Sequence, residues 1–189
     1  IIPITDLKKK IGYMSFGNDS AVSFFSHLNK YSKVDEIVNI NLKNSDSIIS
    51  KYNTIIIGVH ANSKTPWNSY KINKKEIDLI NHIAKKVDVI LNVFGSPYTL
   101  KPFKSIRSIK GVIVSYQNSI IFQQKSAQLI FGALNSKGRL PVTIGKLFDV
   151  GDGIKIKHIN RLSYGTPESV SMSSIKLRKI DSLVNIAID

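Results

Sequence analysis

Runs of apolar residues alternate along this chain with segments in which apolar residues recur every three or four positions. The continuous runs Thr54–Val59 and Val87–Phe94 predict strands that are covered on both faces, as in a parallel sheet. Shorter apolar runs predict three more strands, at Ile11–Phe16, Val34–Ile40 and Gly111–Ser115. Helical spacing predicts helices between them, near Ser20–Tyr31, Asn44–Tyr52, Asn73–Lys85 and Ser119–Leu134. The alternation predicts an α/β fold: a three-layer sandwich with an open, mostly parallel, doubly wound sheet of five or six strands.

Two of the predicted helices carry sequence signals for their first turn. Asn18 or Asp19 is expected to cap the first helix, because short polar side chains accept hydrogen bonds from free backbone amides at a helix start. Asn73 and Glu76 have the spacing of a capping box, in which each side chain satisfies a backbone amide of the other residue.

The segment Ala127–Ile144 predicts an apolar helix, a tight turn at Asn135–Gly138 and a short strand that begins at Pro141. Its string GALNSKGRLPVTI closely resembles the phrase FGxxNPSGRLPVT, which closes the second, α/β sandwich domain of family 3 glycoside hydrolases. Thr54–Asn62 and Val87–Leu100 also fall in the order and spacing of that domain. The resemblance covers most of residues 1–147 and implies the same fold as the periodicity does.

The resemblance also bears on activity. In that family the nucleophilic aspartate lies in a preceding (β/α)8 barrel, and in the β-glucosidase branch a glutamate after the third sandwich strand is the general acid/base. The corresponding loop here, Gly58–Tyr70, contains no carboxylate, although retaining hydrolysis needs two carboxyl groups or an equivalent proton donor. The N-acetylglucosaminidase branch, whose His/Asp acid/base pair lies on a barrel loop, is the better match. The resemblance thus implies a domain without catalytic residues, inactive alone, that packs on and shapes the barrel of a β-N-acetylglucosaminidase-like enzyme.

The changes of composition along the chain predict three parts. Residues 1–147 form the sandwich domain, residues 148–172 a linker or extended arm that packs back on it, and residues 173–189 the first helix of a following domain. This tail resembles the opening helix of penicillin-binding-protein-like (β-lactamase-like) serine hydrolases. The implied partners are therefore the N-terminal barrel and a C-terminal serine hydrolase-like domain of one polypeptide. Ser173 and Lys176 match the short motif S-x-x-K, but a helix cap is the favoured interpretation of this serine.

Two loops at the carboxyl ends of the central strands supply the candidate site residues, since open parallel sheets bind ligands and partners at that edge. These residues are expected to face the barrel or a bound sugar; they are His60, Asn62, Trp67, Tyr70, Gly95, Ser96 and Tyr98.

Two other functions stay open at this stage. The chain could be a carbohydrate-binding module that holds an N-acetylglucosamine-containing glycan through the loops at 60–70 and 95–98, with Trp67 stacking on the sugar. A doubly wound nucleotide-binding protein is a weaker alternative, because only Gly17 of a dinucleotide fingerprint is present.

Composition narrows the remaining possibilities. The chain has 189 residues, 42% of them hydrophobic, which is enough for one domain with a full core, and its apolar runs are too short for a membrane span. The net charge of +14 comes from dispersed lysines and arginines, so nucleic-acid binding is not expected. There is no cysteine, and the four histidines lack metal-ligand spacing, so neither a metal nor a cofactor is expected. The family resembled suggests a periplasmic or cell-surface location.

Overall fold

A computed structural model describes residues 1–17, 19–60 and 72–188, in which five strands form a single parallel sheet. The strands run in the order β2-β1-β3-β4-β5. Their bounds are β1 Ile11–Gly17, β2 Val34–Glu36, β3 Thr54–His60, β4 Asp88–Phe94 and β5 Gly111–Val114. The predicted strands are thus found, with β2 shorter than its apolar run. The predicted α/β sandwich with an open parallel sheet is confirmed.

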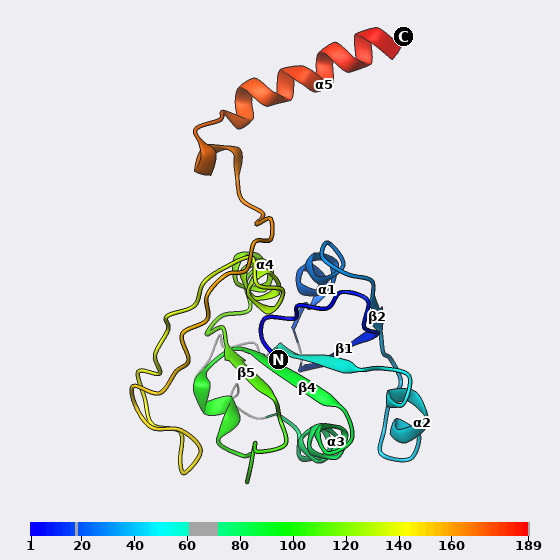
Figure 1. The fold of residues 1–189 in the computed structure, drawn as a ribbon, viewed down its shortest axis with the longest axis vertical. Coiled ribbons are helices and arrows are strands. Elements are labelled where there is room, and N and C mark those ends of the chain that lie inside the picture. Colours follow the sequence, from blue (N-terminus) through cyan, green and yellow to red (C-terminus); the bar gives the residue numbers. More distant parts are fainter. Residues whose placement is uncertain (18, 61–71, 189) are drawn as a thin grey trace.

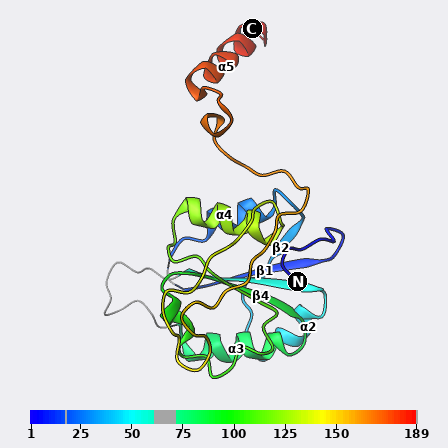
Figure 2. The same cartoon turned by 60° about the vertical axis from the view of Figure 1, so that its left-hand side comes forward.

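Helices cover both faces of the sheet. α1 (Val22–Leu28) and α4 (Ile120–Ile130) lie side by side on one face, and α2 (Ser45–Ile49) and α3 (Lys74–Ala84) lie on the other (Figures 1 and 2). Each face has its own apolar core. All seven residues of β3 are buried, because successive side chains point alternately into the two cores. This explains why β3 is a continuous apolar run rather than an alternating one.

The two helix starts differ in how well they were predicted. Asn73 and Glu76 form the predicted capping box at the start of α3. The expected cap of α1 by Asp19 is wrong, because the helix begins after Ala21 and has no side-chain cap of its own, while Asn18 lies outside the described residues. A side chain from α4 instead accepts a hydrogen bond from a backbone amide in the first turn of α1.

The segment after α4 contains no regular strand among the described residues, so the strand predicted from Pro141 is wrong. The chain turns at Gly132, which has a left-handed φ of 76°, and then runs beside a later segment. Single antiparallel bridges join Ser136 to Ile156 and Ile144 to Phe148. The segment pairs with this arm instead of extending the sheet, and Pro141 donates no ladder bond. Apolar side chains of residues 140–148 pack on the core beside α2 and α3: Leu140, Ile144, Leu147 and Phe148.

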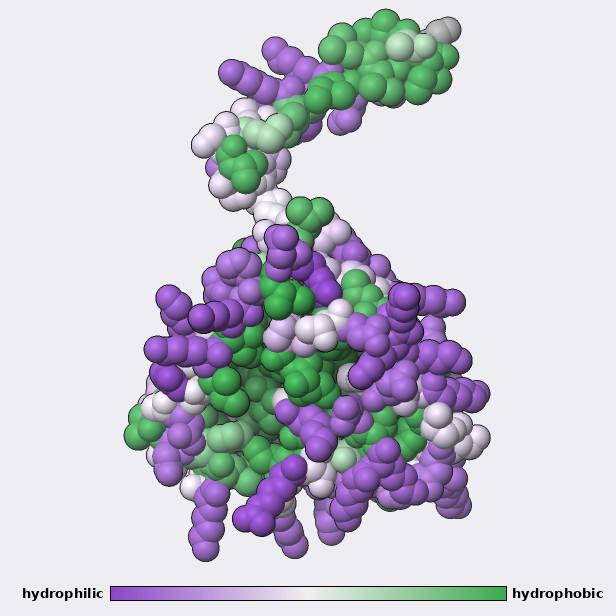
Figure 3. Space-filling view, in the orientation of Figure 1, coloured by the Kyte–Doolittle hydropathy of each residue, from purple (hydrophilic) through white to green (hydrophobic). Residues whose placement is uncertain are grey.

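The last described helix, α5 (Ser174–Ile188), stands apart from the sandwich (Figures 1 and 2). None of its described residues is buried, and its apolar side chains are exposed over its surface (Figure 3). Ser173 Oγ accepts a hydrogen bond from Lys176 N at 3.3 Å, which is the capping role favoured above for this serine. Whether residues 173–189 begin another domain stays a prediction. No helix in the described ranges has the length and apolarity needed to cross a membrane.

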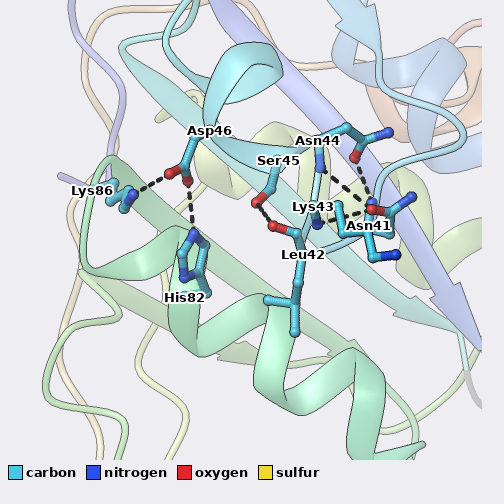
Figure 4. A network of polar contacts seen from close by, with 8 residues as sticks. All are labelled: Asn41, Leu42, Lys43, Asn44, Ser45, Asp46, His82 and Lys86. Atoms are coloured by element: carbon cyan, nitrogen blue, oxygen red, sulfur yellow. Dashed lines mark hydrogen bonds and ion pairs between the residues drawn. The ribbon is translucent and has the colours of Figure 1, made fainter.

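A polar cluster joins α2 to α3 on the outside of the sandwich (Figure 4). Asp46 Oδ1 lies 2.7 Å from His82 Nε2, and its other carboxylate oxygen binds Lys86. These contacts lower the pKa of Asp46, with the Lys86 hydrogen bond as the main cause. Because Asp46 is largely exposed to water, the cluster is a surface link between two helices and offers no enclosed site.

The capping box of α3 gives a first prediction. Asn73→Ala is expected to lower the free energy of unfolding by about 1 kcal/mol, because the Lys75 amide loses its acceptor at the helix start. Urea denaturation followed by circular dichroism measures the effect. Lys74→Ala, in the same exposed turn, is the control and is expected to change stability little; equal losses in both variants would contradict the capping role.

Candidate functional site: the carboxyl edge of the sheet

The carboxyl ends of the parallel strands meet at one edge of the sheet. The order of the strands reverses between β1 and β3, and ligands and partners of doubly wound sheets bind at such a point. The two strands end close together: a Cβ on Gly17 would lie 2.2 Å from the carbonyl oxygen of His60, and Gly17 has a φ of 101°. Only glycine fits there without moving one of the strands.

His60, the last residue of β3, is the central side chain of this edge and is fully buried. Its Nε2 lies 3.0 Å from the Tyr13 hydroxyl, and its Nδ1 lies 2.8 Å from Asn118 Oδ1. The ring stacks on Phe94 with a centroid separation of 4.6 Å and an interplanar angle of 16°. Gly58 makes room for this arrangement, because a Cβ there would lie 2.5 Å from His60 Nε2.

The hydrogen-bond network around His60 fixes which of its nitrogens carries the proton. The Phe24 amide can only donate, so the Gln123 oxygen that it contacts at 2.8 Å is the acceptor. The Gln123 amide nitrogen then donates to Asn118 Oδ1 and to the Ser20 carbonyl, each at 2.8 Å. Asn118 Nδ2 donates to the same carbonyl at 3.0 Å. Asn118 Oδ1 must therefore accept from His60 Nδ1–H, and His60 Nε2 accepts from the Tyr13 hydroxyl.

Burial is the main influence on the acid–base state of this pair. It lowers the pKa of His60, against smaller opposing effects of the Asn118 hydrogen bond and of Asp19. It raises the pKa of the Tyr13 hydroxyl well above its ordinary value. Both groups are therefore neutral near pH 7. A neutral imidazole with both nitrogens occupied is suited to holding strands and helices together rather than to delivering a proton.

The same network supplies the missing cap of α1. Gln123 Oε1, from α4, accepts a hydrogen bond from the Phe24 amide in the first turn of α1, which is where a local Asn or Asp would have acted. A smaller network lies nearby, where Ser115 Oγ contacts Asn92 Nδ2 at 3.1 Å and Ser126 Oγ at 2.7 Å. Together they tie α1 and α4 to the ends of β1, β3, β4 and β5.

The structure places some of the predicted site residues, and three of them fall outside its description. Gly95 is buried next to Phe94, which is paired in register with His60. Ser96 caps the short 3₁₀ helix η1 (Pro97–Leu100), and Tyr98 is partly exposed. The structure thus brings His60 beside the loop at 95–98. The remaining predicted site residues lie outside the described residues: Asn62, Trp67 and Tyr70.

A group of exposed apolar side chains on this edge was not predicted. We call it the edge patch; it consists of Val22, Tyr116, Ile120, Ile121 and Phe122. Val22 is 75% exposed, Ile120 63% and Ile121 67%. The bonds of Asn118 and Gln123 to the Ser20 carbonyl link the segments that precede and begin α1 and α4, which carry these side chains at the carboxyl edge. The sequence signal is a run of three large apolar residues directly after the cap Ser119.

The described residues do not form a metal site at this edge or elsewhere, since no group of three His, Cys, Asp or Glu side chains converges among them.

The comparisons with known proteins agree with this fold. The chain matches the family model described as "Glycosyl hydrolase family 3 C-terminal domain" over residues 3–175, and it therefore belongs to that family. This confirms the resemblance found in the sequence. The match extends past residue 147, into the arm and the segment before α5.

Two solved structures are similar to this chain at low sequence identity. A β-glucoside phosphorylase, BglX, has a TM-score of 0.56 and 16% sequence identity, and the alignment covers 76% of this chain and 27% of that one. A β-glucosidase from Paenibacillus barengoltzii has a TM-score of 0.45 and 15% identity over 76% of this chain and 22% of its own, too low a similarity to carry an argument. The chain thus spans about a quarter of the length of these proteins. No match was found among curated proteins.

The network around His60 gives the second prediction. Gln123→Leu is expected to lower the free energy of unfolding by about 1–3 kcal/mol, because Asn118 Oδ1 and the Phe24 amide each lose a buried partner. Urea denaturation measures the change. The control is Gln124→Leu on the same helix, which is only half-buried and for which a small change is expected. A loss in Gln124→Leu as large as in Gln123→Leu would remove the case for the network.

Proposed function

We propose that this chain is the non-catalytic sandwich domain of a β-N-acetylglucosaminidase-like member of glycoside hydrolase family 3, and that its carboxyl edge packs on a (β/α)8 catalytic barrel. Membership of the family's C-terminal domain supports the general role. The exposed apolar side chains of the edge patch support the choice of this edge as the surface that contacts the barrel.

The edge patch has the properties of a protein-protein contact. Exposed apolar side chains are normal when scattered, but a contiguous group of them marks a surface that is covered in the working protein. Four of its residues lie on the first turns of α1 and α4, whose starts are linked by hydrogen bonds of Gln123 and Asn118, and Tyr116 lies in the loop before α4. The patch also lies at the sheet edge that carries His60 and the loop at 95–98. A barrel docked on this edge would cover the apolar side chains and be positioned by a preformed surface.

The absence of catalytic groups is inferred from the sequence and from His60. The segment 58–70 contains no carboxylate, and glycoside hydrolysis by a retaining mechanism requires a proton donor and a nucleophile. His60 is buried and neutral, with both ring nitrogens engaged, so it is not available as that donor. The preference for N-acetylglucosaminides rests on the sequence resemblance, whereas the two solved proteins named above are described by their action on β-glucosides.

The alternative of an independent sugar-binding module has less support. A binding face needs accessible polar and aromatic groups, and the His60 ring lies in the interior. Trp67 and Tyr70 remain the candidates for such a role. A C-terminal serine hydrolase-like domain also stays a prediction, based on the likeness of the tail.

The isolated chain gives the third prediction. We expect no turnover of an aryl β-N-acetylglucosaminide and no saturable binding of chitooligosaccharides, measured by release of the aryl group and by calorimetric titration. Barrel-independent turnover would refute the non-catalytic role. Saturable binding that is lost in Trp67→Ala, whose side chain is expected in a polar loop, would instead favour the sugar-binding module.

The edge patch gives the fourth prediction. Ile121→Asp is expected to leave the stability of this chain nearly unchanged, because the side chain is already in water. In the full-length polypeptide that the proposal requires, the same change is expected to lower both thermal stability and glycosidase activity, because it places a charge in an apolar interface.

A matched control separates this from a general effect of added charge. Ile154→Asp introduces the same charge at an exposed apolar residue of the arm, outside the edge patch, and is expected to behave alike in both contexts. If Ile121→Asp and Ile154→Asp had equal effects in the full-length polypeptide, the edge patch would not be the barrel-facing surface.

A further inference from the structure

A short segment within the arm crosses the C-terminal ends of α1 and α4 before the chain leaves for α5. We call residues 159–164 the strap; its course past α4 can be followed in orange in Figure 1. Ile159 N donates to the Gly132 carbonyl at 2.8 Å, the Tyr31 hydroxyl donates to the Leu162 carbonyl at 3.0 Å, and Tyr164 N donates to Gln128 Oε1 at 2.9 Å. The strap is therefore held along its whole length.

Arg161 is the strongest anchor of the strap. Its guanidinium donates to the carbonyls of Ile4 at 2.9 Å, Phe131 at 2.7 Å and Thr5 at 3.3 Å. Phe131 is the C-cap of α4, where free carbonyls and the helix dipole favour a cation. Arg161 thus ties the strap both to the end of α4 and to the N-terminal segment of the chain.

Tyr164 packs the strap against two aromatic rings of α1 and the turn after it. Its ring meets His27 edge to face at 5.1 Å and Tyr31 at 5.6 Å. Lys30 Nζ lies 4.5 Å from the centre of the Tyr164 ring, and Lys125 Nζ donates to the Tyr164 carbonyl at 3.2 Å. The ring therefore covers the imidazole from the side of the solvent, and two lysines flank the contact.

His27 is the unusual group beneath this cover. It is 2% exposed, and its Nε2 is buried without a hydrogen-bond partner. The charged groups that act on it are Lys30, just past α1, and Lys125, on α4, and both are cations. Burial first, and then these two lysines, lower the pKa of His27. Tyr31 does not offset this charge: burial, followed by the influence of Tyr164, raises the pKa of Tyr31 to about 12, so that it stays neutral.

We propose that the strap is an acid-sensitive latch, docked while His27 is neutral and released when His27 is protonated. A proton on the buried nitrogen would create a cation with no acceptor beside two other cations, which is costly in the interior. Release of Tyr164 lets water reach the imidazole and removes that cost. The strap connects the sandwich to α5, so its release would free the position of that helix relative to the sandwich.

The sign of the pH dependence follows from the direction of the pKa shift. The pKa of His27 is lower with the strap docked than in water, where it is about 6.5. Docking is therefore fully supported above about pH 6.5 and weakens as the pH falls from there towards the docked pKa. With one proton involved, the ratio of docked to released strap changes by at most about tenfold per pH unit.

The proposal is tested on the whole 189-residue chain, which has no cysteine of its own. Spin labels on Lys101→Cys, in the sandwich, and Ser163→Cys, in the strap, report the docking through their distance distribution. We expect a narrow distribution at about pH 7.5 and a broad one at about pH 5.0, on either side of the ordinary histidine pKa. NMR titration of the His27 imidazole is expected to give a midpoint below about 6.5 that coincides with the loss of the Tyr164 amide signal of the docked state.

Variants assign the response to His27. His27→Phe keeps an aromatic ring against Tyr164 but cannot be protonated, so the distribution is expected to stay narrow at both pH values. His158→Phe, at an exposed histidine next to the strap, is the matched control and is expected to keep the response. A response that persists in His27→Phe, or is lost in His158→Phe, would overturn the proposal. So would an unchanged distribution in the native chain, or loss of the methyl signals of buried β3 residues over the same pH range, which would indicate global unfolding.

A second variant keeps the test decisive if His27→Phe does not fold. Tyr164→Ala removes the cover, so the strap is expected to be released at both pH values and the pKa of His27 to rise towards about 6.5. An unchanged His27 pKa in this variant would show that the strap does not control the imidazole, and the proposal would fail. None of these outcomes depends on the proposed packing of the edge patch on a barrel.

Discussion

The carboxyl edge of this domain depends on a chain of hydrogen bonds that begins at a backbone amide and ends at a tyrosine. The Phe24 amide fixes the orientation of Gln123, which fixes Asn118, which in turn sets the tautomer of His60 and makes Tyr13 a donor. Each group in the series can act only as a donor or only as an acceptor toward the next one, because the preceding hydrogen bond fixes its orientation. Two helices and two strands are thereby joined at a position where their backbones would otherwise have free amides and carbonyls.

This network explains why the first turn of α1 can be apolar on the outside. A helix start usually attracts polar side chains, since its amides need acceptors. In α1 that acceptor comes from Gln123 in the interior. Val22, in that turn, is therefore exposed without a capping task, whereas the exposed Ile121 follows α4's own cap, Ser119. The interior hydrogen bond to Gln123 thus allows an apolar side chain on the outside of the same turn.

The sequence was a good guide to features set by local pattern and a poor one to those set by distant contacts. The run Thr54–Val59 identified β3 because burial on both faces leaves a continuous apolar signal. The capping box of α3 was identified because its partners are three residues apart. The cap of α1 was misassigned because its acceptor lies 99 residues away. The strand at Pro141 was misassigned because that segment pairs with an arm, which the local pattern does not reveal. Gln123, which caps α1, could not be singled out in the sequence, because it is one of several polar residues of α4.

Two buried histidines, His27 of α1 and His60 of β3, show how the same residue type acquires different sensitivity to acid. Burial lowers the pKa of both. At His60 both nitrogens have partners, and the Tyr13 oxygen next to Nε2 can become an acceptor if a proton arrives there. At His27 the Nε2 atom has no partner, and the charges that act on the ring are two lysines, so a proton finds neither an acceptor nor a compensating charge. The groups around His60 also belong to strands in the middle of the sheet, whereas His27 is covered by a strap at the periphery. The free-energy cost of protonation is therefore relieved most readily at His27, because the strap that covers it lies at the periphery and can move away.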